Sequence, residues 1–203
     1  MATNSDLKKF AQSARRQLRE QVAGRLEQVL GVDSVEVREK KNAVDQLKKQ
    51  IAEHGKAEVI DKVAYIWFNR FCALRYMDVN LYNSVRVVSP APGNIQPELL
   101  QEAKAGYLPE EWKKFIDSEK VFGLLNGSIR AENGQQDAYQ RLLVGVCNAY
   151  ARIMPFMFEA IEDYTELLMP QDLFSENSVL TQTRLAMSDE ACQDVEVIGW
   201  LYQ

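Results

Sequence analysis

Five basic residues near the start of the chain have types and spacing suited to holding phosphate groups. Lys8, Arg15 and Arg19 recur at intervals that place them on one flank of a helix. Together with two neighbours further round the helix they form what we call the basic ridge, which comprises Lys8, Lys9, Arg15, Arg16 and Arg19. Contacts between basic side chains of this kind and phosphate groups make binding to nucleic acid dependent on salt. The alternative is a solvated helix face, where basic residues are common.

Two further arginines, Arg70 and Arg75, fall within an otherwise apolar segment. A buried guanidinium is unfavourable unless it has a partner. We therefore expect structural ion pairs with carboxylates such as Glu58, Asp61 or Asp78, or with one elsewhere in the chain. The alternative is that these arginines reach a nucleic-acid phosphate or a neighbouring domain.

No set of residues points to catalysis or to metal binding. His54 is the only histidine, and Cys72, Cys147 and Cys192 lie far apart, so the sequence predicts no zinc site. The serines lack a histidine that could activate them. There is neither a secretory signal nor an apolar run near the ~20 residues that span a bilayer. These features are typical of a cytoplasmic protein whose cysteines are reduced and lie in its core.

The residues between 57 and 80 form the helix that must organise the rest. They are apolar or aromatic on nearly every side, and a helix of this kind is buried. Three- and four-residue apolar spacing predicts a first helix from Asn4 or Ser5 to Gly31. Further helices are expected over residues 40–54, 97–105, 109–117, 119–125, 135–154, 156–168 and 178–187, with a last one capped by Ser188.

We therefore predict an all-α, multi-helix domain around a buried central helix. A small extended element is expected near Val85–Val88, because a proline-rich segment that starts at Pro90 stops any helix there. We interpret residues 1–203 as a single helical domain.

The sequence ends on a strongly apolar helical segment without a glycine, a proline or a basic residue to close it. We interpret the chain as the front portion of a longer protein, with the segment facing the missing part. The predicted interface residues are Val195, Ile198, Trp200, Leu201 and Tyr202. The alternative is a terminal helix that docks fully into the core.

The net charge of −5 conceals an uneven distribution. Residues 1–56 contain 12 basic and 8 acidic residues, a net charge of +4, whereas residues 131–203 contain 3 basic and 12 acidic residues, a net charge of −9. The acidic end should repel phosphates, so any nucleic acid is expected on the N-terminal side.

Three segments carry a resemblance to a known family. Residues 64–80 (AYIWFNRFCALRYMDVN) resemble the N-terminal region of PglX-type DNA methyltransferases, which belong to BREX phage-defence systems and are similar to single-chain restriction-modification enzymes. Residues 168–174, followed by 178–180, and residues 194–203 agree with the same family in the same order.

The resemblance implies a parent protein that transfers a methyl group from S-adenosylmethionine to adenine N6 in DNA, after the base leaves the stack. Such enzymes need a glycine-containing cofactor loop and an Asn-Pro-Pro-Tyr type loop. The six prolines are never adjacent, and no glycine loop follows a strand. No catalytic, cofactor-binding or metal residue is therefore predicted in this chain.

The implied role is that of an N-terminal domain that packs on the missing catalytic domain of the same protein. It would help to position DNA or partner subunits, including other BREX components, and would have no contact with membranes. The alternative is a self-standing helical module that binds other proteins and has no DNA role.

Overall fold

The computed structural model describes residues 4–32, 35–155, 157–158, 163–194 and 196–201, and this part of the chain is helical without a strand. The all-α prediction is confirmed. The elements are α1 (Asn4–Gly31), α2 (Val35–Glu39), α3 (Lys41–His54), α4 (Lys56–Val79), α5 (Glu98–Lys104), α6 (Glu110–Lys113), α7 (Ser118–Asn126), α8 (Gly134–Ala151), α9 (Asp163–Leu167), α10 (Val179–Ala186), the short 3₁₀ helix η1 (Ala191–Gln193) and α11 (Glu196–Leu201).

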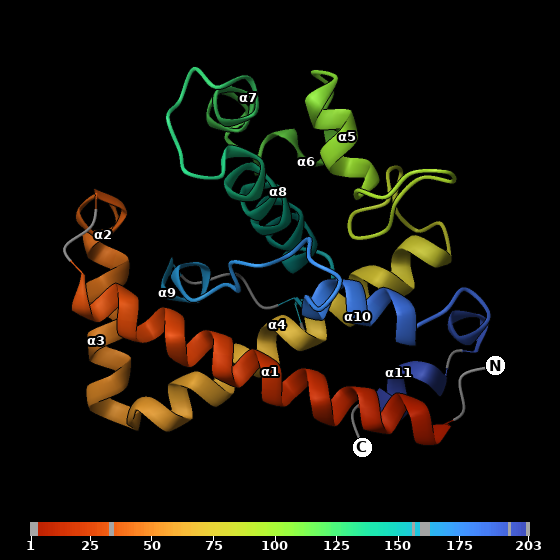
Figure 1. The fold of residues 1–203 in the computed structure, drawn as a ribbon, viewed down its shortest axis with the longest axis horizontal. Helices are drawn as coiled ribbons and strands as arrows, with labels where there is room; N and C mark the ends of the chain where they lie inside the picture. The colour runs from red at the N-terminus through yellow and green to blue at the C-terminus, as the bar shows by residue number, and fades with distance from the viewer. Residues whose placement is uncertain (1–3, 33–34, 156, 159–162, 195, 202–203) are drawn as a thin grey trace.

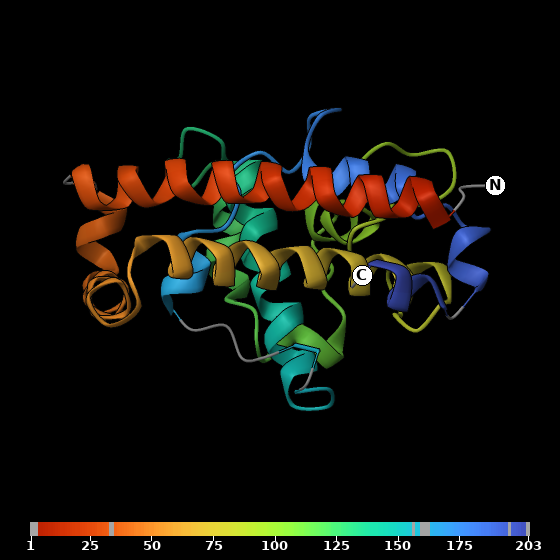
Figure 2. The ribbon, with the colours of Figure 1, turned by 90° about the horizontal axis from the view of Figure 1, so that it is seen from below.

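Helix α4 is the central element, as its sequence predicts. It runs antiparallel to α1, and the two lie side by side in two layers (Figures 1 and 2). Helices α10 and α11 pack against the N-terminal half of α1, while α8 projects from the side of α4 that faces away from α1. The first helix thus contacts the last ones.

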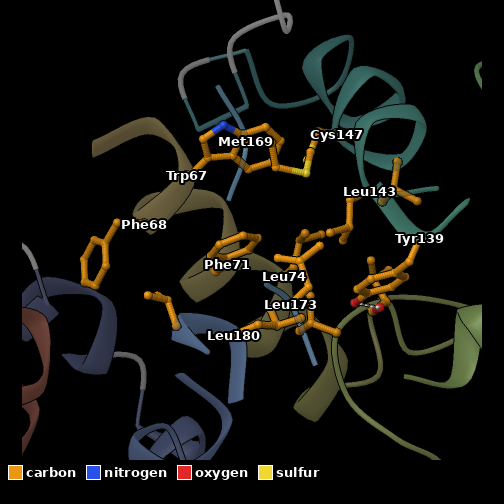
Figure 3. Packing of buried hydrophobic residues seen from close by; sticks show 14 of the residues in the cluster. Trp67, Phe68, Phe71, Leu74, Tyr139, Leu143, Cys147, Met169, Leu173 and Leu180 are labelled. Atoms are coloured by element: carbon orange, nitrogen blue, oxygen red, sulfur yellow. Dashed lines mark hydrogen bonds between the residues drawn. The ribbon is translucent and has the colours of Figure 1, made fainter. Parts of the chain in front are cut away.

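One part of the core lies between α4 and α8. Trp67, Phe71 and Leu74 of α4 are fully buried and face Tyr139, Leu143 and Cys147 of α8 (Figure 3). Their burial is the main favourable contribution to folding, at roughly 25 cal/mol for each Å² of apolar surface removed from water. All three cysteines are buried and free, as predicted for core residues.

The segment after α4 is held by one carboxylate rather than by a strand. Asp78, at the end of α4, accepts hydrogen bonds from the backbone N–H groups of Val87, Val88 and Ser89, each 2.8 Å long, and from the Asn83 amide. No strand forms at Val85–Val88, because these N–H groups bond a side chain instead of a neighbouring chain. Burial raises the pKa of Asp78, and the four hydrogen bonds act in the opposite direction.

Short side chains start several helices. Asp117, Asn133 and Ser178 accept a backbone hydrogen bond in the first turn of α7, α8 and α10. Ser188 was expected to cap the last helix, but its hydroxyl accepts from Ala191 N–H and so starts η1. That expectation is wrong because a 3₁₀ turn intervenes before α11.

The helix expected over residues 156–168 is seen only as α9, since residues 156 and 159–162 lie outside the described part of the chain. None of the described helices combines the length and the hydropathy that a bilayer-spanning segment requires.

Candidate nucleic-acid interface

Three members of the basic ridge are available on the surface of α1. Lys8, Lys9 and Arg16 are exposed, and none of them forms an ion pair with a described residue. Because their charges are not neutralised within the domain, they can contact an anion without breaking an existing interaction.

Arg19 is also exposed but has a partner. Its Nε lies 2.5 Å from a carboxylate oxygen of Asp61 on α4, and both side chains are more than half exposed. Exposed ion pairs contribute only about 0–1 kcal/mol. Arg19 could therefore exchange this carboxylate for a phosphate at small cost.

Arg15 does not belong to the exposed ridge. Its side chain is half-buried, its Nη2 donates to the carbonyl oxygen of Leu201 at 2.5 Å, and its guanidinium lies 4.9 Å from the centre of the Phe68 ring. It thereby satisfies a carbonyl at the C-terminal end of α11, where positive charge is favourable. The expectation that Arg15 stands beside Arg19 as a phosphate contact is corrected to a structural role.

Arg25 has a similar role that sequence reasoning missed. Its Nε donates to the carbonyl oxygen of Leu167, the last residue of α9, at 3.0 Å. Lys40 adds an ion pair with Glu166 of the same helix at 2.7 Å. No spacing rule reveals these contacts, because they join residues more than 120 positions apart.

Both arginines of α4 are buried, and an ion pair with a carboxylate is seen for Arg75. Arg70 is almost fully buried, and its guanidinium lies 5.1 Å from the centre of the Trp67 ring. Arg75 donates to the Met187 carbonyl and to the Ser89 hydroxyl, both at 2.9 Å, and pairs with Asp189 at 2.6 Å. Its carboxylate partner is thus elsewhere in the chain. Arg75 ties α4 to two loops.

Replacing Arg75 with alanine should lower the free energy of unfolding by about 2–3 kcal/mol, because a hydrogen bond from a charged donor contributes about 1.5–3 kcal/mol. Asp189→Ala is the matched control. The Asp189 side chain is 82% exposed, so its loss should cost less than about 1 kcal/mol. Urea denaturation of both variants would measure the difference, and equal losses would show that the Asp189 pair dominates.

Helix α11 contains three of the predicted interdomain residues, Ile198, Trp200 and Leu201. Leu201 and Val197 are buried within the domain, where α11 packs on α1, so Leu201 is not open to another domain while α11 is docked. Val195 and Tyr202 lie outside the described residues, and the side chains of Ile198 and Trp200 are not described either. The interface role of these four residues stays a prediction.

The buried thiols are poor nucleophiles. Burial raises the pKa of Cys147 and of Cys192 to about 11 and raises that of Cys72 further. Only the thiolate attacks or binds metal, so these groups are inert at neutral pH. Among the described residues, no group of acidic, histidine or cysteine side chains is arranged to hold a metal ion.

Comparison with known proteins gives two relatives. The chain is 35% identical to the adenine-specific methyltransferase BrxX of Escherichia coli O9:H4 (strain HS). The alignment spans 164 residues and covers 78% of the chain. Over most of its own length, the chain is similar to an adenine-specific methyltransferase. A second relative, the adenine-specific methyltransferase PglX of Lacticaseibacillus casei (strain Zhang), is 28% identical over 192 residues, or 86% of the chain.

These matches confirm the resemblance to the PglX-type methyltransferases over most of the chain. The chain spans only 13% of the length of BrxX and 15% of that of PglX. No model of a protein family matches the sequence.

Proposed function

We propose that this chain is the N-terminal helical domain of an S-adenosylmethionine-dependent, adenine-specific DNA methyltransferase of a BREX phage-defence system in the cytoplasm. The similarity to BrxX and PglX over most of the chain is the observation that supports this proposal most strongly. The relatives are several times longer, which leaves ample sequence for the cofactor and adenine-binding loops that this chain lacks.

Within that protein, the domain packs on the catalytic domain and helps to position DNA. Lys8, Lys9 and Arg16 are the phosphate contacts that we favour, because they are exposed and have no partner among the described residues. Contacts to phosphate set affinity and register, whereas contacts to base edges set the sequence that is read. The ridge therefore contributes affinity without sequence preference.

In the full-length methyltransferase, replacing Lys8, Lys9 and Arg16 together with glutamate should weaken DNA binding. Each lost phosphate contact should reduce the slope of log affinity against log salt by about one unit. The adenine that is methylated should stay the same. Binding isotherms over a salt series, together with sequencing of methylated sites, would measure both effects. Arg15 is left intact because it bonds the Leu201 carbonyl of α11.

The matched control replaces Lys41, Lys48 and Arg130 with glutamate, since these residues are exposed and belong to elements other than α1. The change in net charge is then identical. If both triple variants weaken binding equally, the effect comes from net charge and α1 is not the contact. Failure of the wild-type protein to methylate adenine would instead contradict the proposed function itself.

A further inference from the structure

A surface at the end of the domain away from α9 combines exposed apolar side chains with one arginine. Ile95, in the loop between α4 and α5, is 86% exposed, and Leu185 on α10 is 68% exposed. Arg184, next to Leu185, joins the two, because its Nη1 lies 3.5 Å from the carbonyl oxygen of Ile95. We call Ile95, Arg184 and Leu185 the α10 surface. Helix α10 lies beside α4 near this loop (Figure 1).

The Arg184 guanidinium is partly desolvated without an anion to compensate it. Its two hydrogen bonds, to Ile95 and to Thr181, are both 3.5 Å long, at the limit of what counts as a bond. None of the described carboxylates forms an ion pair with it. Burial lowers the pKa of Arg184, Tyr139 acts in the opposite direction, and Arg75 acts in the same direction as burial.

Arg75, which contacts the same loop through Ser89, provides a contrast. Arg75 has a carbonyl, a hydroxyl and the carboxylate of Asp189. Arg184 has two marginal contacts, although it is one of only three basic residues among the 12 acidic residues of 131–203. A half-buried arginine between exposed apolar residues is typical of a protein interface, where arginine and large apolar side chains supply most of the binding energy.

We infer that the α10 surface packs against an apolar, carboxylate-bearing face of the methyltransferase portion of the same polypeptide. A carboxylate from that face would pair with Arg184, while its apolar side chains would cover Ile95 and Leu185. The inference rests on the proposed function and names the face of this domain that docks.

Two observations favour this partner. A phosphate backbone would neutralise Arg184 but would leave Ile95 and Leu185 in water, whereas a protein face can satisfy all three. The relatives are several times longer than this chain, and under the proposed function the other domains of the same polypeptide are held nearby at high effective concentration. Domains held together in this way can form an interface even when each of its contacts is weak.

The test compares amide hydrogen exchange in the isolated 203-residue chain with that in the full-length methyltransferase. Residues 90–97 and 179–186 should exchange at least about tenfold more slowly in the full-length protein, as expected for amides that become covered. Ile95→Asp combined with Leu185→Asp should abolish this protection. Arg184→Glu should abolish it as well, because it places a carboxylate opposite a carboxylate.

The matched controls are Ile153→Asp and Arg152→Glu at the end of α8. Ile153 is 73% exposed and Arg152 is exposed, and both lie outside the α10 surface. These variants should keep full protection. A cooperative thermal unfolding transition of each isolated variant would show that the variant folds. The variant that combines Ile95→Asp with Leu185→Asp changes exposed positions only, so it provides a test that does not depend on the half-buried Arg184.

Equal exchange of residues 90–97 and 179–186 in the two proteins would overturn the inference, as would protection that survives the Ile95→Asp and Leu185→Asp changes. A full-length protein that methylates adenine but shows no protection contradicts only the docking face. One that shows protection but methylates no adenine contradicts the proposed function and leaves the docking face standing.

Discussion

Replacing Asp78 with alanine should lower the free energy of unfolding by about 3–6 kcal/mol. The substitution leaves the buried N–H groups of Val87, Val88 and Ser89 without an acceptor, and each unsatisfied buried group costs about 1–3 kcal/mol. The alanine variant no longer has to bury a carboxylate, and this gain offsets part of the loss. The segment also carries the Val87 carbonyl that accepts from the Tyr139 hydroxyl, so its release would disturb the contact with α8. Denaturant unfolding followed by circular dichroism measures the change.

Asp78→Asn is the control for shape. The asparagine side chain keeps one acceptor oxygen but turns an amide donor toward the backbone donors. The Asp78→Asn variant should therefore be less stable than the wild type and more stable than the Asp78→Ala variant. If alanine and the wild type unfold at the same denaturant concentration, water replaces the carboxylate and the segment is not held by Asp78.

The Trp67→Ala variant should lose about 3–5 kcal/mol of stability, the usual cost of truncating a buried large aromatic side chain. Trp67 is fully buried, packs 5.7 Å from the centre of the Phe71 ring, and donates its indole N–H to the Thr165 carbonyl at 3.2 Å. The substitution would leave a cavity between α4 and the segment that includes α9. It would also remove the aromatic ring that contacts the Arg70 guanidinium. Calorimetry or urea denaturation would measure the loss.

Tyr65→Ala, two residues earlier on α4, provides the comparison. Tyr65 is 51% exposed, so its loss should cost less than about 1 kcal/mol. If Trp67→Ala and Tyr65→Ala lose similar free energies of unfolding, the burial of Trp67 is not what makes this side chain important.

Apolar periodicity predicted most of the fold. The continuous apolar character of α4 identified the central helix, and the spacing in α1, α8 and α10 gave helices close to those observed. The short helix α2 was missed, because its five residues are too few to show a period. Pro97 and Pro109 were expected to be the first residue of a helix, and each lies one position before it.

The candidate site was harder to predict, since side-chain partners depend on distant residues. Spacing on α1 grouped Arg15 with Arg19, yet Arg15 turns toward Leu201 and Arg19 toward Asp61. The need of a buried arginine for a partner was recognised at Arg75, but the identity of that partner, Asp189, requires the tertiary structure. Asp78 was considered as an ion-pair partner and instead binds three backbone N–H groups, which no sequence pattern indicated.

The contact between Arg15 and Leu201 has a consequence for how the chain folds during synthesis. The two residues are 186 positions apart, and α10 and α11 both pack on α1. Helix α1 therefore leaves the ribosome well before residues 179–201, which cover part of its apolar stripe. Contacts of such long range form slowly, and the chain meanwhile exposes apolar surface to aggregation. We therefore expect α1 to stay partly uncovered until residues 179–201 have been made, so conditions that slow translation between these two segments should raise the aggregated fraction of the protein.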